Sequence, residues 1–243
     1  MKSIKKGKFK IYYRNKEEFQ ATYDEIFKRE EYQFFSEKDD LFIIDCGSHI
    51  GLSILYFKNK FPEAKILGFE PNPENFKILK KNVKENKLDN VTLTNAALSD
   101  KTGIADLWVK RKKKNRWTFG DSIVENLWYK KDECRKIKIK TVKLSSYINE
   151  NIDCLKLDVE GAEGIIVQEI EGKLKFVNRM FLEFHGRKSN KKINDLIKIT
   201  KILKKNNFQL KFPLRELRFL VPEIFWRFST KDWNGKIYAF KKN

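Results

Sequence analysis

The residues in this sequence best suited to acid–base chemistry are three carboxylates and a histidine near the ends of two apolar runs. Asp158 and Glu160 follow the apolar run 152–157, and Glu183 and His185 lie at the end of a second run. If both runs are parallel strands of a doubly wound sheet, their carboxyl ends meet at one edge. Glu183 and His185 also project to the same side, because side-chain direction alternates along a strand. The pattern predicts one catalytic cluster.

The sequence leaves two interpretations of this cluster open. In the first, His185 accepts a proton from an attacking hydroxyl and is oriented by Glu160 or Glu183, since histidine titrates at about pH 6.5. In the second, Asp158, Glu160 and His185 ligate a divalent cation, because carboxylates suit Mg²⁺ or Mn²⁺. For Glu163, a few residues further on, a role in this cluster and a place in the first turn of a helix are equally consistent with the sequence.

A glycine turn between an apolar run and a helical pattern predicts a nucleotide site. Gly47 permits a sharp turn against a ligand, and Gly51 lets the helix approach the strand. His49 occupies the middle glycine position of G-x-G-x-x-G, where close backbone approach serves a pyrophosphate, so a ligand without a pyrophosphate fits better. Ser48 and His49 are assigned to this site, although His49 could equally serve the turn alone.

Residues at the next two strand ends extend the predicted site. Glu70 lies about 20 residues beyond the glycine turn, where a carboxylate can accept hydrogen bonds from both ribose hydroxyls. Pro71 and Asn72 follow it and are assigned to the same site. Near Asn95 and Ala96, small residues leave room for adenine, and the Asn95 side chain can hydrogen-bond to it.

A carboxylate at the end of the first strand indicates the charge of the ligand. Asp45 directly precedes the glycine turn. It would face a cationic group, which the amino acid portion of S-adenosylmethionine offers and NAD does not. The turn therefore favours S-adenosylmethionine.

Alternating strands and helices must position these residues. Apolar runs at 41–45, 65–70 and 91–94 alternate with helical patterns at 50–61 and 73–86. This βαβαβ order is the first half of a doubly wound α/β sheet. The later predicted elements are a strand at 152–157, a helix at 163–170, a strand at 180–184, a helix at 193–205 and strands at 208–212 and 236–240.

The rest of the chain is predicted to add to this one domain. Since 243 residues leave little room for a second domain at roughly 150 residues each, residues 1–40 are interpreted as a strand–helix cap. Residues 41–243 form the main domain, with insertions at 110–133 and 213–232. The first insertion is flanked by two predicted strands that pair, at 103–109 and 136–142.

The two insertions have open roles. Residues 110–116 are a basic run followed by Trp117 and Phe119. Such runs are usually solvated, but basic and aromatic residues near a cleft could also hold an anionic or glycan substrate. Residues 213–232 mix aromatic residues with arginines, which favours a helical lid over a surface that rests on a membrane.

The amino-acid composition gives only weak information about the binding partners and the cellular location of the protein. The 52 Lys and Arg against 33 Asp and Glu give a formal net charge of +19, which attracts nucleic acids, acidic lipids and anionic substrates. Lysines spread along the whole chain are also what a lysine-favouring genome produces. No apolar run reaches the roughly 18 residues of a membrane span, and no signal peptide follows the basic N-terminus. A cytoplasmic protein, peripheral to the membrane at most, is expected.

Five segments resemble the FkbM-type S-adenosylmethionine-dependent methyltransferases. They are residues 43–51, 68–76, 95–100, 153–163 and 183–186. The Glu-Pro-Asn-Pro and Asp-Val-Glu-Gly-Ala-Glu sequences within them are the most specific. The resemblance implies a class I methyltransferase fold, which is Rossmann-like and doubly wound with a mostly parallel seven-stranded sheet and an antiparallel last strand. It also implies O-methylation, often of sugars or other natural-product hydroxyls.

The sequence departs from the family pattern at two places. Ser48 and His49 replace the small residue and the asparagine common there, and the tail beyond Gly186 matches nothing known. The first departure affects the cofactor assignment little, and the second leaves the acceptor open.

The predicted function is S-adenosylmethionine-dependent O-methylation of a sugar hydroxyl in a glycan or glycoconjugate. An RNA methyltransferase is the alternative that the charge supports, but the Asp-Val-Glu-Gly sequence differs from the motif of base amino methylation. A cofactor-binding scaffold without activity is the third reading. Nucleic acid is thus disfavoured as a partner, and a carbohydrate or another hydroxyl-bearing acceptor is expected.

Overall fold

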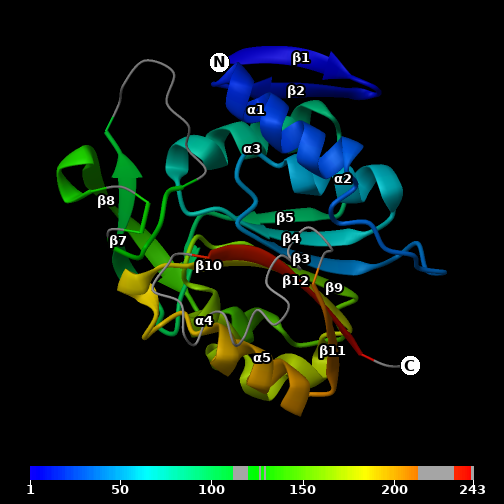
Figure 1. The fold of residues 1–243 in the computed structure, drawn as a ribbon. Helices are drawn as coiled ribbons and strands as arrows, with labels where there is room; N and C mark the ends of the chain where they lie inside the picture. Colours follow the sequence, from blue (N-terminus) through cyan, green and yellow to red (C-terminus); the bar gives the residue numbers. More distant parts are fainter. Residues whose placement is uncertain (112–119, 126, 129, 213–232, 242–243) are drawn as a thin grey trace.

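A central sheet with helices on both faces forms the body of the molecule (Figure 1). The computed structural model describes residues 1–111, 120–125, 127–128, 130–212 and 233–241. The basic run from residue 112 onward, Trp117, Phe119 and the segment 213–232 lie outside the described residues.

The central sheet has seven strands in the spatial order β11–β12–β10–β9–β3–β4–β5. β12 runs antiparallel to both of its neighbours, whereas the pairs from β10 to β5 are all parallel. The predicted mostly parallel sheet with an antiparallel last strand is therefore confirmed. The strands are β3 (Phe42–Cys46), β4 (Lys65–Phe69), β5 (Val91–Thr94), β9 (Cys154–Leu157), β10 (Arg179–Gly186), β11 (Phe208–Lys211) and β12 (Trp233–Lys241).

Helices cover the sheet where the sequence predicts them. α2 (Leu52–Lys60) and α3 (Pro73–Glu85) lie on one face, and α4 (Glu163–Glu169) and α5 (Leu196–Lys205) lie on the other (Figure 1). The start of α3 follows from its sequence, because the Asn72 side chain accepts a hydrogen bond of 2.8 Å from the Glu74 amide. Proline is favoured in the first helical turn. Among the described residues, no helix is long and apolar enough to cross a bilayer.

The N-terminal segment packs on the outer side of α2 and α3. It contains a hairpin of β1 (Lys2–Lys6) and β2 (Phe9–Tyr13), then α1 (Lys16–Tyr23), which a π-helix, Asp24–Lys28, continues. The Asn82 side chain of α3 accepts a hydrogen bond of 2.7 Å from the Tyr12 amide. Buried apolar residues of this segment and of α2 and α3 form one cluster. The cap thus shares its core with the main domain.

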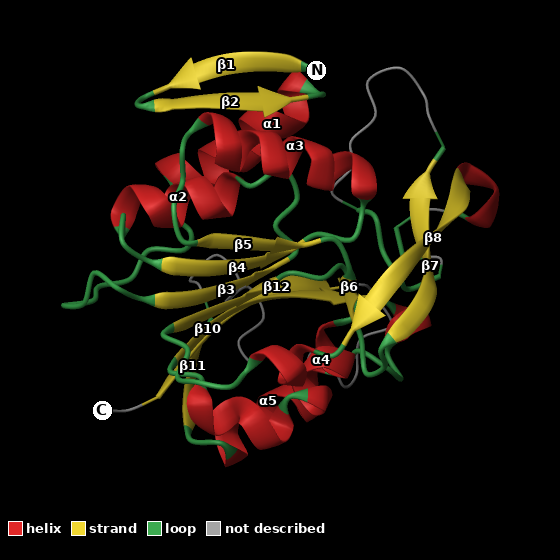
Figure 2. Cartoon of the chain, turned by 180° about the vertical axis from the view of Figure 1, so that it is seen from behind, coloured by secondary structure: helices red, strands yellow, loops and turns green. Residues whose placement is uncertain are grey.

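A second, smaller sheet stands beside the carboxyl ends of the central strands (Figure 2). It has the order β6–β8–β7, with bounds β6 (Ala97–Leu98), β7 (Gly103–Lys110) and β8 (Cys134–Val142). β7 and β8 pair antiparallel, as the sequence predicted for the strands that flank the insertion. Ser122 also bridges to Trp108 of β7, so the described part of the insertion lies against this sheet.

Candidate active site

A cavity of about 470 Å³ opens at the carboxyl ends of the central strands. Its wall combines strand ends, part of the insertion and part of the N-terminal segment. The predicted site residues that line it are Gly47, Ser48, His49, Glu70, Pro71, Ala96, Asp158, Glu160, Glu183 and His185. Asp45, Gly51, Asn72 and Asn95 are not among the described residues that line it.

The glycine turn after β3 is fixed by its neighbours. Gly47 has φ of +84°, and a Cβ built there would lie 1.8 Å from the carbonyl oxygen of Asp158. Gly51 has φ of +93°, and its Cβ would lie 2.7 Å from the Leu79 side chain of α3. Gly51 was expected to let a helix approach a strand, but it serves a contact between two helices. Of the two glycines, Gly47 lines the cavity and Gly51 does not.

Glu70 is held at the end of β4 by backbone amides. Its carboxylate accepts hydrogen bonds of 2.9 Å from the His49 amide and 2.8 Å from the Asn72 amide. Burial raises the pKa of Glu70 to about 8, although these two bonds lower it. The Asn95 side chain donates to the carbonyl oxygens of Glu70 and Pro71, at 2.8 and 3.1 Å. Asn95 thus supports this rim of the cavity instead of facing a ligand.

Asp45 has a partner that the sequence analysis missed. Its Oδ1 lies 3.2 Å from Nζ of Lys156, and its Oδ2 accepts a hydrogen bond of 2.6 Å from Ser53. Lys156 also lies 3.4 Å from Asp158 Oδ2 and donates to the Gly47 carbonyl oxygen at 2.9 Å. Asp45 was expected to meet a cation of the ligand, but the cation beside it belongs to the protein. A lysine inside the apolar run 154–157 was the available signal, because a buried charge requires a partner.

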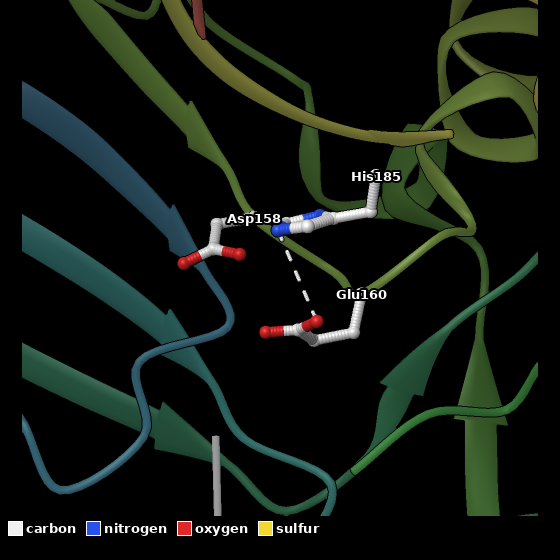
Figure 3. A group of neighbouring side chains, drawn as sticks. All are labelled: Asp158, Glu160 and His185. Carbon is white, nitrogen blue, oxygen red and sulfur yellow. Dashed lines mark ion pairs between the residues drawn. The ribbon is translucent and has the colours of Figure 1, made fainter. Parts of the chain in front are cut away.

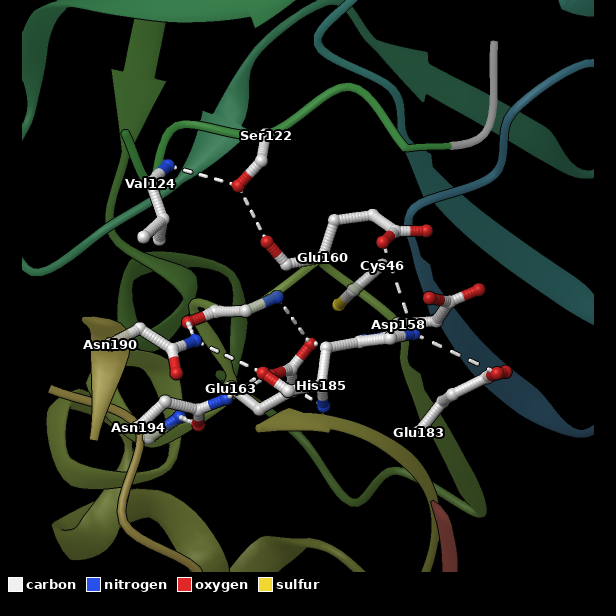
Figure 4. Close-up of polar contacts among 12 residues, drawn as sticks. Cys46, Ser122, Val124, Asp158, Glu160, Glu163, Glu183, His185, Asn190 and Asn194 are labelled. Carbon is white, nitrogen blue, oxygen red and sulfur yellow. Dashed lines mark hydrogen bonds and ion pairs between the residues drawn. The ribbon is translucent and has the colours of Figure 1, made fainter. Parts of the chain in front are cut away.

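His185 lies among three carboxylates (Figure 4). Its Nδ1 is 2.9 Å from Glu163 Oε1, while its Nε2 is 3.7 Å from Glu183 Oε1 and 3.9 Å from Glu160 Oε2. Glu163 in turn accepts a hydrogen bond of 2.6 Å from the Asn194 side chain. The orienting carboxylate on Nδ1 is therefore Glu163, and not Glu160 or Glu183 as expected, because α4 begins directly beneath the end of β10.

These carboxylates control the charge of the imidazole. Burial lowers the pKa of His185, but Glu160 and Glu163 outweigh it and raise that pKa well above its usual value. Burial also raises the pKa of Glu183, yet its bond to His185 and the charge of Lys236 bring it to about 2. These neighbours therefore favour the protonated imidazole, and His185 can serve as a base only after losing that proton.

Trp128 is a further wall residue that the sequence analysis did not single out. Its indole Nε1 donates to Glu160 Oε2 at 2.5 Å, and its ring meets the His185 ring edge to face at 5.5 Å. The Ser122 hydroxyl donates to the Glu160 carbonyl oxygen at 2.5 Å (Figure 4). The described part of the insertion therefore holds Glu160 in place. Nothing in the local sequence distinguished Trp128 from the other tryptophan of the insertion.

His49 makes stability depend on pH. It has φ of +48°, and burial lowers its pKa to about 4. Because it stays neutral when folded but takes a proton when unfolded below about pH 6.5, acidification favours the unfolded state. We expect His49→Asn, which keeps a residue tolerant of positive φ, to remove about 2 kcal/mol of the stability that the protein loses between about pH 7.5 and pH 5.

Urea unfolding at the two pH values measures this effect. The other histidine, His185, and the carboxylates away from position 49 are the same in both proteins, so they cancel in the comparison. Glu18 lies 3.6 Å from His49 Nε2, so the comparison is repeated with Glu18→Gln in both proteins. Equal losses of stability in the variant and the wild type would show that His49 carries no such cost.

Comparison with known proteins gives a consistent set of similarities. Residues 45–210 match the sequence model of the methyltransferase FkbM domain. Methyltransferase sdnD of Sordaria araneosa is 29% identical over 195 residues, which are 69% of this chain and 75% of the relative. Methyltransferase 1 of Beauveria bassiana is 27% identical over 169 residues, which are 63% of this chain and 68% of the relative.

One solved structure shows the fold. A crystal structure of a methyltransferase FkbM from Methylobacillus flagellatus superposes with a TM-score of 0.55 at 14% sequence identity, over 90% of this chain and 48% of that chain. The present chain thus spans about half the length of the solved protein. At this identity the likeness is one of fold.

Proposed function

Because the chain belongs to the methyltransferase FkbM domain family, as its motifs predicted, we propose that it transfers a methyl group from S-adenosylmethionine to a sugar hydroxyl. The methyltransferase family and the fold are confirmed, while the donor, the hydroxyl and the sugar are proposals. The observation that supports them is that one cavity is lined by Glu70 at the end of β4 and by His185 at the end of β10, in two different halves of its wall.

The half of the cavity at β3 and β4 suits the nucleoside of the donor. Each oxygen of the Glu70 side chain accepts one backbone amide, and the Asn75 side chain also bonds to this group. The carboxyl oxygens have further acceptor capacity for ribose hydroxyls. The turn at Gly47 exposes backbone without a side chain in the way. Ala96 and Ala97 leave space beyond it for a flat base.

Removing Glu70 tests the donor site. Glu70→Ala should weaken binding of S-adenosylmethionine and S-adenosylhomocysteine by at least about tenfold, since two hydrogen bonds to the oxygens of the Glu70 carboxyl group are lost. Calorimetric titration measures this directly. Exposed Glu63 is the control, and Glu63→Ala should bind as the wild type does. If the folded wild type binds neither nucleoside, the proposal is wrong and a scaffold without methyl transfer becomes the better description.

The half of the cavity at β9 and β10 suits the attacking hydroxyl. Methyl transfer needs an acceptor oxygen in line with the methyl carbon and the leaving sulfur, and a group that takes the proton. We assign the proton to Nε2 of His185, which Glu163 orients through Nδ1. Next to a positive sulfonium the pKa of His185 falls, because like charges oppose each other. His185 would therefore become a base when the donor is bound.

The same cluster also fits a divalent cation, which is the second proposal for it. One ligand atom each of Asp158, Glu160 and His185 lies within 4.8 Å of the others (Figure 3). Glu163 on Nδ1 leaves Nε2 for an ion, as is usual for histidine ligands. Mg²⁺ or Mn²⁺ held there would lower the pKa of an acceptor hydroxyl. Loss of activity on dialysis against a chelator, restored by one of these metals, would support this proposal.

A further inference from the structure

Part of the cavity wall comes from outside the family-matched residues 45–210. Apart from Asn234 of β12, its described residues belong to the N-terminal segment: Ala21, Thr22, Glu25, Ile26 and Tyr32. Lys236 of β12 anchors this segment to the sheet, since its Nζ lies 2.8 Å from Glu25 Oε1 and 3.6 Å from Glu183 Oε2 and also contacts Glu31. The segment is thus fixed next to the catalytic cluster.

The strand order shows which half of the cavity the segment borders. β5, β4 and β3 follow one another along the sheet, then β9, β10 and β12. Ala96, Glu70 and Gly47 lie at the ends of the first three, and Asp158, His185 and Asn234 at the ends of the second three. Because Lys236 binds Glu25 to β12 and Glu183 of β10, this part of the segment borders the second half, where the acceptor would lie. The preceding turn of α1 also reaches the glycine turn, since Glu18 Oε1 lies 3.6 Å from His49 Nε2.

The charge of this half is opposite to that of the whole chain. The described lining residues of this half include the carboxylates of Glu25, Asp158, Glu160 and Glu183, against Lys156 and the imidazole of His185. A second lysine, Lys236, contacts Glu25, Glu31 and Glu183. Lys156 is already paired with Asp45 and Asp158. The chain as a whole carries a formal charge of +19. A cavity with this lining repels an anion that the outer surface would attract.

We propose that Thr22, Glu25 and Tyr32 select the acceptor, and that its reacting end is a hydroxylated ring without a phosphate or carboxylate group. This inference rests on the proposed methyl transfer. Carboxylates only accept hydrogen bonds, so Glu25 and Glu183 can bind the hydroxyl or ammonium donors of such a ring. A phosphate offers acceptors and negative charge, and both are unfavourable there. Tyr32, buried beside Lys156, forms part of the same wall.

Three probes that share one ring test the proposal. They are methyl glucoside, glucosamine and glucose 6-phosphate, added at equal millimolar concentration to the full-length protein saturated with S-adenosylhomocysteine. Ligand-observed saturation-transfer NMR detects such weak binding. We expect signals from the neutral ring and the amino ring and none from the phosphate. Equal or stronger binding of the phosphate would overturn the proposal and favour a nucleic-acid-like acceptor, and absence of binding by all three would overturn it as well.

Variants of the wall separate selection from folding. Glu25→Gln should weaken glucosamine binding about tenfold, the loss of one charge-assisted hydrogen bond, and reduce the discrimination against the phosphate. Glu37→Gln, at an exposed position of the same segment, should change neither. Thr22→Val gives a second test that leaves all charges in place. It should weaken the binding of methyl glucoside, the neutral probe. Unchanged probe binding in both wall variants would refute the role of the segment.

Failure of this inference can be told apart from failure of the proposed function. Binding of S-adenosylhomocysteine is measured first and depends on Glu70, which lies in the other half of the cavity. If the nucleoside binds and the probes do not behave as expected, only the acceptor inference is wrong. If the nucleoside does not bind at all, the proposed function itself is wrong.

Discussion

Replacing His185 by glutamine should lower the turnover number by about 10²- to 10³-fold, the usual contribution of a positioned general base. Glutamine retains a side chain that can donate to Glu163, but it cannot accept a proton at neutral pH. The affinity for S-adenosylhomocysteine should stay within about twofold, because the donor half of the cavity is untouched. The measurement is transfer of a labelled methyl group at saturating donor, together with calorimetry on the same preparation.

Variants of two carboxylates beside His185 serve as controls for this result. Glu163→Gln keeps the hydrogen bond to Nδ1 but removes its charge, so we expect a smaller loss and a pH–rate profile shifted to lower pH. Glu160→Gln leaves His185 intact. If His185→Gln turns over almost normally, the base assignment is wrong. If Glu160→Gln loses more activity than His185→Gln, the proton goes to the carboxylate instead.

The strand ends of this protein could be predicted from its sequence because their signals are local. Each apolar run of a parallel strand stops at a residue that faces the sheet edge, so Glu70, Asp158 and His185 were placed at one cavity by chain order alone. The period of two along β10 also placed Glu183 and His185 on the same side, and both line the cavity. Topology rules then brought together residues more than 100 positions apart.

The pairing of charges could not be predicted in the same way. Asp45 was matched to a ligand because its partner Lys156 lies on another strand, and β3 and β9 become neighbours only in the sheet. The sequence leaves Glu163 open between a helix-end role and a functional one, because its contact with His185 depends on where α4 starts beneath β10. A local sequence pattern predicts where a carboxylate lies along the chain, but the residue that pairs with it depends on tertiary packing.

The structure of the N-terminal segment also depends on tertiary contacts that its local sequence does not indicate. β1 carries three lysines among its five residues and a single apolar one, Ile4, so its sequence resembles a solvated terminus. It becomes a strand by pairing with β2. Likewise, the wall formed by Thr22, Glu25 and Tyr32 has no motif, because the segment reaches the cavity through tertiary contacts. These are the ion pair of Glu25 with Lys236, the contact of Glu18 with His49 and the packing on α2 and α3.

Replacing Gly47 by alanine should cost about 3 to 5 kcal/mol of unfolding free energy, the sum of a strained left-handed backbone and a forced backbone shift. The added Cβ would lie 1.8 Å from the carbonyl oxygen of Asp158. That oxygen belongs to the main chain after β9, so it cannot rotate away. Either β3 or β9 must move, and Asp158 would leave its place in the catalytic cluster. Methyl transfer should therefore fall together with stability.

Two other glycines with positive φ separate the contributions to this loss. Gly7 has φ of +57° and open space around its missing Cβ, so Gly7→Ala measures backbone strain alone, about 1 kcal/mol. Gly51 has φ of +93° and would press on the end of the flexible Leu79 side chain, so Gly51→Ala should cost about 2 kcal/mol. Urea unfolding followed by circular dichroism ranks the three variants. Should Gly47→Ala prove no less stable than Gly7→Ala, the close approach of the turn to the Asp158 carbonyl oxygen would be refuted.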